Sequence, residues 1–600
     1  MSSTPSHRDP QAPELHDLSW ICVSPSTPLK QILERHQGAP ERGLPAGIAL
    51  VLDEEGGLLG TVTDGDARRA LLRTEDLTTP AREVMRPDPI RLPEGLSFRE
   101  ILRRLPKELE RRGRRSQRFL GKIILVDEQD RPTRVLDYHQ LWEQRVASHR
   151  HVTVVGLGYV GLTLALVLAE EGLRVTGVDL DEDKICALEE GRPYVHEPGL
   201  PELLREQLSH SFSVTTDLPE GSDVFIVAVG TPVEAGLDSQ RPEPSLAMLE
   251  AATRAVAARL TPGALVILRS TVPVGTTRGF VLPLLEQLTG LRGGRDFHLS
   301  FAPERTAEGR ALEELRTLPQ IIGGLDEDSV EATAALFREL THTLVRVESI
   351  EAAELAKLVN NSFRDLSFAF ANQVVQLAAP FNLDAVEVIQ AANRGYPRDP
   401  VPLPSPGVGG PCLSKDPYIL AAARQPSGEI SSTDGLTLSE LGRRVNESMV
   451  QWVATAVLSQ LRRLGKEPGE CSVLICGLAF KGQPETSDIR SSTSLEIARL
   501  LSLEVGELFG HDPVVAPEEI AAAGLQPAQL PAGFDGMDAV LFLNNHRSYS
   551  RLDVFATIRA LAEPPLLFDG WHLFRPEEVL QARPGIYMGL GFTRSSLEES

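Results

Sequence analysis

Cysteine is scarce in this sequence, and long hydrophobic runs are missing. Five cysteines occur among 600 residues, and none belongs to a CxxC pair. Neither a structural zinc site nor a disulfide framework is therefore expected. No apolar run approaches the ~20 residues that a membrane-spanning helix needs, and the N-terminal residues lack the pattern of a signal peptide. We expect a cytoplasmic protein with no metal site and no membrane partner.

An excess of basic charge is also missing. The net charge is −23, and its distribution is uneven: residues 1–150 hold 24 Lys and Arg against 23 Asp and Glu, whereas the remainder holds 36 against 60. An acidic body repels a phosphate backbone, so general binding of nucleic acid is not expected. A chain longer than the ~250–300 residues that one core supports, with two parts of different charge, predicts separate modules.

Residues 1–150 contain two similar hydrophobic units. Each has apolar runs bounded by glycine and aspartate, which predict β-strands, and the first unit continues into a helix with an acidic start at Asp66. The runs are residues 47–53 and 58–63 in the first unit, and residues 122–127 and 135–142 in the second.

These units resemble a pair of cystathionine-β-synthase-type (CBS) domains, which we place at residues 17–146 after a disordered stretch at 1–16. In that family a Thr-x-x-Asp element contacts the phosphate and ribose of an adenine nucleotide, and Thr63 and Asp66 match it. The second unit lacks the element at residues 136–139, so the resemblance implies at most one complete regulatory nucleotide site. A purely structural role for the pair stays open.

A glycine-rich fingerprint begins directly after a predicted strand. The strand 151–155 is followed by Gly156, Gly158 and Gly161, then by an apolar helix and a second strand that ends before Asp179. In this context the glycines permit a tight turn, approach of the backbone to a pyrophosphate and close helix packing, with the helix N-terminus facing the phosphates. Asp179 would accept a hydrogen bond from the adenosine ribose and repel a 2′-phosphate, which favours NAD over NADP.

Two later strands also end in polar residues. The runs 224–232 and 265–277 each pass from apolar residues into a loop, which contains Thr231 in the first and Thr271 in the second. Ligands of an open parallel sheet lie at the carboxyl ends of its strands, so both loops are candidates for contact with the cofactor. The alternative for each is an ordinary strand-to-helix turn with a Ser or Thr cap.

From about residue 150 onward the chain resembles the UDP-glucose/GDP-mannose dehydrogenase family. The matching motifs follow one another in order: GLGYVGL (156–162), EPGL (197–200), VGTPV (229–233), STVPVGTT (270–277), PERTAEG (303–309), EAAELAKLVNNSF (351–363), GVGGPCLSKDP (407–417), GLAFKGQPETSDIRSS (477–492) and GHDP (510–513). So many ordered matches make coincidence an inadequate explanation.

The resemblance implies an α/β fold with two Rossmann-like domains joined by a long central helix and preceded by the CBS pair. The NAD-binding domain is expected at residues 150–346, a central helical domain at 347–466, and a C-terminal UDP-sugar-binding α/β domain at 467–600. The residues support this independently, because 349–379 has a helical pattern without proline and 472–477 reads as a new buried strand.

The thiol of Cys412 decides which chemistry the resemblance implies. A thiol beside a nicotinamide site can trap an aldehyde, and the adduct can be oxidised again to a thioester, so that an alcohol becomes an acid. An unperturbed thiol has a pKa of ~8.5, so a cation must stabilise the thiolate or the oxyanions that follow. Lys357 is the candidate, and Asn361 lies one turn further on the same face of the predicted helix.

In the family's pattern, Lys357 and Asn361 bind oxygens of the reacting centre and position a water molecule. Glu304 matches the acid that serves as base during thioester hydrolysis. Asp416 matches the carboxylate that helps to orient the water, and Thr271 adds a hydroxyl to the same network.

The resemblance further assigns binding residues. Those for the cofactor are Gly156, Gly158, Tyr159, Val160, Gly161, Asp179, Lys184, Thr231, Thr271, Glu308 and Lys415. Those for the nucleotide sugar are Glu304, Lys357, Asn361, Arg398, Gly409, Gly410, Lys481 and Arg490. The glycines offer backbone without side chains that can wrap a sugar closely. Arg398 is assigned to the substrate of a neighbouring subunit, so a homodimer or higher homo-oligomer is expected.

The implied function is NAD-dependent four-electron oxidation of the C6 hydroxyl of a nucleotide sugar to the uronic acid. Glucose-oxidising members read NPEF before the acid, whereas this chain has Ala302-Pro-Glu-Arg305, and residues 569–572 lack the arginine expected there. This is closer to members that oxidise UDP-N-acetylhexosamines, with UDP-glucose and GDP-mannose as alternatives. A two-electron dehydrogenase of the hydroxyacid type and a non-catalytic sugar-nucleotide sensor also stay open. Cys412, Glu304 and Lys357 together argue against the former.

Overall fold

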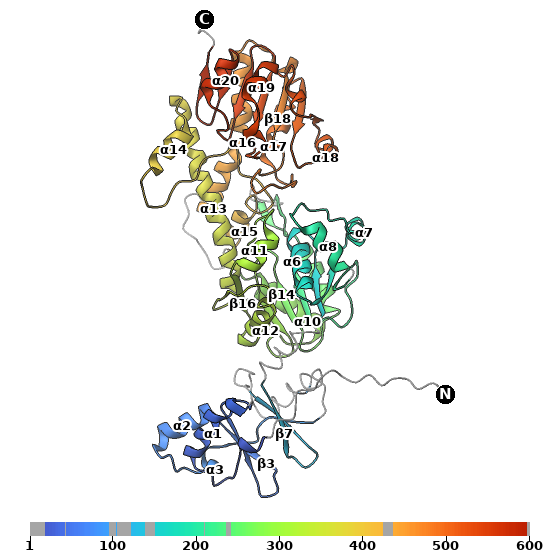
Figure 1. Ribbon diagram of the computed structural model, residues 1–600, viewed down its shortest axis with the longest axis vertical. Helices are drawn as coiled ribbons and strands as arrows, with labels where there is room; N and C mark the ends of the chain where they lie inside the picture. Colours follow the sequence, from blue (N-terminus) through green and yellow to red (C-terminus); the bar gives the residue numbers. More distant parts are fainter. Residues whose placement is uncertain are drawn as a thin grey trace, which may run out of the picture.

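The computed structural model describes residues 18–42, 44–94, 104, 122–137, 151–208, 210–235, 242–423 and 436–596. Along the chain these form an N-terminal module, a first α/β domain, a helical segment and a C-terminal α/β domain (Figure 1). The predicted α/β architecture is therefore confirmed. The stretch 1–16, predicted to be disordered, lies outside the described residues. None of the described helices is both long and apolar enough to cross a bilayer.

The N-terminal module repeats one strand arrangement. In each unit a short strand pairs in parallel with the first strand of an antiparallel hairpin, and a register shift occurs at the end of that strand. The turns agree as well: Asp53 and Asp127 each accept backbone N–H bonds from the residues two and four positions later. The strands are β1 (Cys22–Val23), β2 (Ile48–Leu52) and β3 (Leu58–Thr63) in one unit, and β5 (Arg91–Pro93), β6 (Lys122–Val126) and β7 (Pro132–Asp137) in the other.

The two units share one core, in which Ile48 and Leu50 lie with Ile124 and Val126. The first unit also contains β4 (Arg86–Pro87), α1 (Leu29–Gly38), α2 (Asp64–Thr74) and α3 (Ala81–Val84). The predicted run 135–142 is described only as far as residue 137.

The first α/β domain is built on an eight-stranded sheet of order β10-β9-β8-β11-β14-β15-β16-β17. All pairings are parallel except that of β15 with β16. The strands are β8 (His151–Val155), β9 (Arg174–Val178), β10 (Phe212–Thr215), β11 (Val224–Val227), β14 (Leu265–Leu268), β15 (His298–Phe301), β16 (Gln320–Gly324) and β17 (Leu344–Arg346). After β8 the chain forms β9 and β10 on one side of β8, and it then returns to form β11 on the other side. The carboxyl ends of β8 and β11 therefore flank the crevice in which such sheets bind ligands.

Helices cover this sheet, and a small hairpin extends from it. The helices are α6 (Tyr159–Glu170), α7 (Glu182–Glu189), α8 (Leu200–Leu208), α9 (Ala247–Ala257), α10 (Leu282–Thr289), α11 (Ala311–Thr317) and α12 (Glu327–Phe337); the hairpin is β12 (Val233–Ala235) with β13 (Pro242–Pro244). Residues on both faces of the central strands are buried, which explains why these strands read as continuous apolar runs.

The predicted long helix is α13 (Ile350–Ala378), which runs between the two α/β domains (Figure 1). The Ser349 hydroxyl accepts the Ala352 N–H at 3.1 Å and caps its start, and Pro380 follows its end. The other helices of this segment are α14 (Ala385–Asn393), α15 (Asp416–Ala421) and α16 (Leu438–Arg463). Helix α13 packs against α15 and α16, so the loop that carries Cys412 lies beside it.

The C-terminal domain repeats the turn of the first α/β domain. Gly477 N–H bonds His511 O at 2.8 Å, as Gly156 N–H bonds Val178 O at 2.8 Å. Its sheet has the order β20-β19-β18-β21-β22-β23-β24. The strands are β18 (Ser472–Cys476), β19 (Glu507–His511), β20 (Gln526–Pro527), β21 (Ala539–Phe542), β22 (Leu566–Asp569), β23 (Ile586–Met588) and β24 (Thr593–Ser595), and the helices are α17 (Thr493–Leu501), α18 (Pro517–Ala522), α19 (Val554–Ala560) and α20 (Pro576–Ala582).

Candidate active site

The glycine turn after β8 has the shape that a dinucleotide requires. Gly156 has φ +91°, and a Cβ there would lie 2.9 Å from Ala228 O. A Cβ on Gly161 would lie 1.8 Å from Gly156 O, so close helix packing excludes any side chain. Gly158 is different, because no atom lies within 4 Å of its Cβ position. Open space at the N-terminus of the twelve-residue helix α6 fits a pyrophosphate.

Asp179 follows β9 and faces this turn. Its Oδ2 accepts the Leu157 N–H at 2.9 Å, and its Oδ1 lies 3.7 Å from Lys184 Nζ. The carboxylate therefore stabilises the glycine turn, and its contact with a ribose stays a prediction. Lys184 thus lies beside Asp179, and its contact with the cofactor stays a prediction.

Tyr159 and Val160 begin helix α6, and the Tyr159 hydroxyl donates to the carboxylate of Glu197. Gly309 N–H also bonds this carboxylate, at 2.7 Å to Oε2. Burial and the neighbouring Glu197 carboxylate raise the pKa of the Tyr159 phenol above its ordinary value. Tyr159, predicted to bind the cofactor, thus joins α6 to the 303–309 loop. Glu197 had no assigned role in the sequence interpretation.

The loops after β11 and β14 meet, as expected for neighbouring parallel strands. The Thr231 hydroxyl donates to Thr271 O at 2.5 Å. The second loop is tied to α13 by Glu354, whose buried carboxylate accepts the N–H groups of Gly275 at 2.6 Å and Thr277 at 2.9 Å. Glu354 lies within a matched motif, but only the folded structure shows what it holds.

Glu304 follows β15 and is surrounded by donors. Its Oε1 accepts the N–H groups of Arg305 at 2.6 Å and Thr306 at 2.7 Å. Its Oε2 accepts from Arg269 Nε at 3.2 Å and also from Arg269 Nη2. Burial raises the pKa of this carboxyl, but the Arg269 charge, the Thr306 N–H and the Lys357 charge outweigh it and hold the pKa below its ordinary value. Sequence reasoning missed Arg269, a charged residue directly after the apolar strand β14.

Lys357 projects from α13 and is 8% exposed. Its charge acts on two neighbours, because it lowers the pKa of both the Glu304 carboxyl and the Cys412 thiol. Within the described part of the chain, its ammonium forms no hydrogen bond and no ion pair. The Lys357 ammonium is therefore available to a ligand, and its role at the reacting centre stays a prediction.

Cys412 lies in the loop before α15, with its side chain exposed. Enough protein surrounds the sulfur that burial raises the thiol pKa, and the Asp416 carboxylate raises it further. The Lys357 and Lys415 charges lower it, but they do not outweigh the first two effects. The thiol is therefore protonated at neutral pH in this state.

Asp416 joins the cysteine loop to α13. Its fully buried carboxylate accepts from Asn361 Nδ2 at 2.6 Å and from Lys415 Nζ at 3.0 Å. The structure thus brings together three residues that were predicted separately. Asn361 lies one helical turn from Lys357 on α13, and its bond to Asp416 connects it to the helix that directly follows the Cys412 loop.

The glycines before Cys412 are required by the C-terminal domain. A Cβ on Gly409 would lie 2.3 Å from Ser491 O, and one on Gly410 would lie 2.6 Å from the Phe480 ring. Gly410 also has φ +92° and bonds Ser491 O at 3.0 Å. Protein atoms thus occupy the space that side chains at these two positions would fill, and contact of this backbone with the sugar stays a prediction.

Arg443 of α16 holds the same loop from the other side. Its Nη2 donates to Val408 O at 2.7 Å and its Nη1 to Leu413 O at 3.3 Å. Nη1 also bonds Asp365 Oδ1 at 2.7 Å, and both side chains are almost fully buried. The sequence offered no motif that would identify this arginine.

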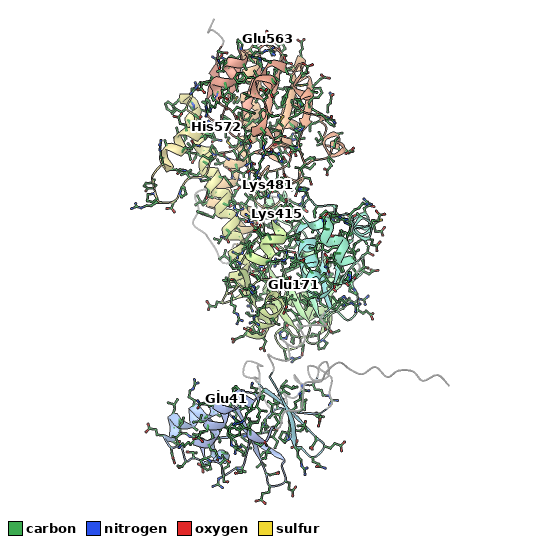
Figure 2. The ribbon with its side chains drawn as sticks, viewed as in Figure 1. Glu41, Glu171, Lys415, Lys481, Glu563 and His572 are labelled. Atoms are coloured by element: carbon green, nitrogen blue, oxygen red, sulfur yellow. The ribbon has the colours of Figure 1, made fainter. Side chains whose placement is uncertain are left out.

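Glu308 lies at the junction with the C-terminal domain. Lys481 Nζ donates to Glu308 O at 2.8 Å, and Arg490 Nη2 lies 3.8 Å from its Oε1. Burial and the Asp488 carboxylate raise the pKa of Glu308 to about 7, although Lys481 and Arg490 lower it. Lys415 and Lys481, labelled in Figure 2, both lie at this junction, where each interacts electrostatically with Cys412.

We expect the titration of Glu308 to reduce stability as the pH rises from about 5 to 8. The pKa is 4.5 for an ordinary glutamate and about 7 in the folded protein, so the folded state keeps a proton that the unfolded state releases. The free energy of unfolding therefore falls as the pH rises from the ordinary pKa of 4.5 to the folded pKa of about 7. Between these pH values the free energy of unfolding of Glu308→Gln should therefore rise relative to that of the wild type by on the order of 2 kcal/mol.

The measurement is urea unfolding of both proteins at the two pH values. Glu313→Gln, which changes an exposed glutamate of the same domain, serves as the control and should change little. If the free energy of unfolding changes equally with pH in the wild type and in Glu308→Gln, the raised pKa assigned to Glu308 is wrong.

Two predicted residue sets lie apart from this site. Arg398 is exposed, and no described contact joins it to the other predicted residues. Thr63 and Asp66 form a capping box at the start of α2, and the Asp66 carboxylate also bonds Arg69 at 2.5 Å and Arg86 at 2.7 Å. Nucleotide binding there stays a prediction. Among the described residues no group of three or more His, Cys, Asp or Glu side chains is arranged to hold a metal ion.

Comparison with family profiles matches four segments of the chain. Three belong to the UDP-glucose/GDP-mannose dehydrogenase family: its NAD binding domain at residues 150–341, its central domain at 351–448 and its UDP binding domain at 474–576. The fourth is a CBS domain at residues 15–73. It covers the first N-terminal unit, whereas the second unit is supported by the repeated strand arrangement.

Relatives match the part of the chain that follows the N-terminal module. The UDP-N-acetyl-D-mannosamine dehydrogenase of Pyrococcus horikoshii is 33% identical over 431 residues, which cover 71% of this chain and 97% of the relative. The NDP-N-acetyl-D-galactosaminuronic acid dehydrogenase of Ralstonia nicotianae is 34% identical over 412 residues, covering 67% and 92%. The solved UDP-D-ManNAc dehydrogenase from Pyrococcus horikoshii superimposes with a TM-score of 0.65 at 31% identity, covering 74% of this chain and 99% of that one.

Proposed function

Because the chain belongs to the UDP-glucose/GDP-mannose dehydrogenase family and is an NAD-dependent nucleotide-sugar dehydrogenase, we propose that it oxidises a UDP-N-acetylhexosamine at C6 to the uronic acid through a thioester on Cys412. The observation that carries the thioester is that the loop with Cys412 lies against α13, where Asp416 bonds Asn361 and the Lys357 charge acts on the thiol. A simple alcohol oxidation needs no nucleophile at this position.

NAD, when bound, accepts the electron pair of each of the two oxidations. The glycine turn and the N-terminus of α6 would hold its pyrophosphate, and Asp179 would hold its ribose. Thr231 and Thr271 form the adjoining wall at the carboxyl ends of β11 and β14.

Cys412 acts once the sugar has become an aldehyde. The sulfur bonds to the aldehyde carbon, and the thiol proton passes to the aldehyde oxygen, beside the Lys357 ammonium. After the second oxidation, water attacks the thioester carbonyl, the C–S bond breaks, and the thiol is restored as the acid leaves. The Asn361–Asp416 pair is placed to orient that water.

Glu304 is predicted to act as a base, and its hydrogen bonds limit how it can accept a proton. Four donors occupy both carboxylate oxygens, so one hydrogen bond must be exchanged before this group accepts a proton. Glu308, with a pKa of about 7, titrates near neutral pH at the same junction. Both carboxyl groups therefore belong to the proposed proton-transfer network.

The sugar is proposed from two kinds of support. The sequence Ala302-Pro-Glu-Arg305 departs from that of glucose-oxidising members. Two relatives are named UDP-N-acetyl-D-mannosamine dehydrogenase and NDP-N-acetyl-D-galactosaminuronic acid dehydrogenase, and both names contain an N-acetylated sugar. The UDP binding domain at 474–576 supports a uridine diphosphate carrier.

The experiment that tests the function counts NADH per sugar. Oxidation of an alcohol to an acid removes four electrons and NAD accepts two, so we expect two NADH per UDP-N-acetylhexosamine. UDP-GlcNAc, UDP-ManNAc, UDP-glucose and GDP-mannose are compared under one set of conditions. Release of one NADH together with a stable aldehyde would overturn the thioester route, and preference for UDP-glucose or GDP-mannose would overturn the substrate.

Homo-oligomerisation stays a prediction that the surface supports. Large apolar side chains are exposed on and just after α13, namely Phe363, Phe370, Leu377 and Phe381, which are 55–75% exposed. An apolar stripe of this size on a helix is a common site of subunit contact. Regulation through the CBS units also stays a prediction.

A further inference from the structure

Arg269 is buried, and every contact that it makes fixes its direction. Its guanidinium side chain is 0% exposed and lies against the Phe337 ring. Nη1 donates to Ala302 O at 2.9 Å and to Gln320 Oε1 at 3.1 Å, which leaves Nε and Nη2 aimed at Glu304 Oε2. The planar fork of an arginine thus occupies this oxygen with two donors at once.

Glu304 consequently has no lone pair left for Lys357. Backbone N–H groups occupy Oε1 and Arg269 occupies Oε2. The two charges of Glu304 and Lys357 nevertheless interact, because Lys357 lowers the pKa of Glu304. Among the described residues the ion pair of Glu304 is made with Arg269, and none is made with Lys357.

We propose that Arg269 is a positioning residue that saturates the Glu304 carboxylate and so keeps the Lys357 ammonium free for Cys412 and the reacting sugar oxygen. This inference rests on the proposed function, since it assigns a reason to the state of Lys357 in that reaction. Arg269 touches neither the thiol nor the sugar; it acts through Glu304.

The test reads the thiol directly, without turnover. The alkylation rate of Cys412 by iodoacetamide is followed against pH, with peptide mass spectrometry separating Cys412 from the other cysteines. Arg269→Met leaves Oε2 open to Lys357, so the ammonium is captured and the thiol loses its main cation. We expect the thiol profile, meaning the dependence of the alkylation rate on pH, to move to higher pH by about one unit. At a pH below the pKa of the thiol, alkylation is then about tenfold slower.

Other charges also face this thiol and must be held constant. Asp416 and Glu308 raise its pKa, and Lys415 lowers it. Lys481 and Arg490 interact with it from the C-terminal domain. None of these residues is changed by the variants used here.

A double variant separates positioning from simple structural damage. Arg269→Met combined with Glu304→Gln removes the carboxylate that would capture Lys357, so the wild-type thiol profile should return. Arg269→Lys keeps the charge but cannot bond Glu304, Ala302 and Gln320 together, and we expect an intermediate shift. Arg254→Met, which breaks an exposed ion pair with Glu250 in the same domain, should leave the profile unchanged.

A wild-type thiol profile in folded Arg269→Met would overturn the proposal. So would a shift that persists in the double variant, because the shift would then not depend on Glu304. If Arg269→Met does not fold, Arg269→Lys and the double variant decide by the same criterion. Failure of the proposed function is seen separately, as one NADH per sugar in the wild type.

Discussion

Replacing Cys412 with serine is expected to lower kcat for uronic acid formation by about a thousandfold or more. The hydroxyl oxygen is a far weaker nucleophile than sulfur, and the ester it would form is hydrolysed less readily than a thioester. NADH release and uronic acid are measured together, so that arrest at the aldehyde is distinguished from arrest before it. Binding of NAD and of the UDP-sugar should persist, since the thiol makes neither site.

The matched control is Cys186→Ser, which changes an exposed cysteine of α7. It should retain full activity and release two NADH per sugar. If Cys412→Ser also forms uronic acid at a rate near that of the wild type, the assignment of Cys412 as nucleophile is wrong. The protein would then be a dehydrogenase that uses another route to the acid.

Arg443→Met is expected to destabilise the protein by about 3–5 kcal/mol, the usual cost of leaving one partner of a buried ion pair alone. The Asp365 carboxyl would lose its cation, and the carbonyl groups of Val408 and Leu413 would lose their donors. Burial already raises the pKa of Asp365 to about 6 against the opposing effect of Arg443. The loss should therefore be smaller at about pH 5, where this carboxyl is neutral, than at about pH 8.

Urea unfolding at both pH values measures this loss. Arg462→Met is the control, because Arg462 lies on the same helix but pairs with Glu504 at the surface and should contribute less than about 1 kcal/mol. A loss in Arg443→Met no larger than that of the control would contradict the role assigned to Arg443. The variant should also lose activity, because the displaced loop carries Cys412.

The order of the family's domains along the chain could be predicted from the sequence alone, and so could candidates for the reacting groups. A strand, a glycine turn, an apolar helix and a second strand ending before Asp179 are local features, and each reads directly from residue spacing. The spacing of Lys357 and Asn361 likewise places both on one helix face before any fold is known. Because these properties depend on neighbours within a few residues, the sequence was sufficient for them.

Only the tertiary structure decided how these groups are held and charged. Arg269 and Glu304 follow the neighbouring strands β14 and β15 and bond each other. Arg443 bonds the cysteine loop from helix α16, and the backbone of Ser491 in the C-terminal domain requires a glycine at position 409. Glu308 reaches a pKa of about 7 through burial and a carboxylate from a different domain. A pKa depends on the solvent excluded and the charges within a few ångströms, and a close approach depends on which backbone lies opposite. Residues distant in sequence supply both, so spacing along the chain could not reveal them.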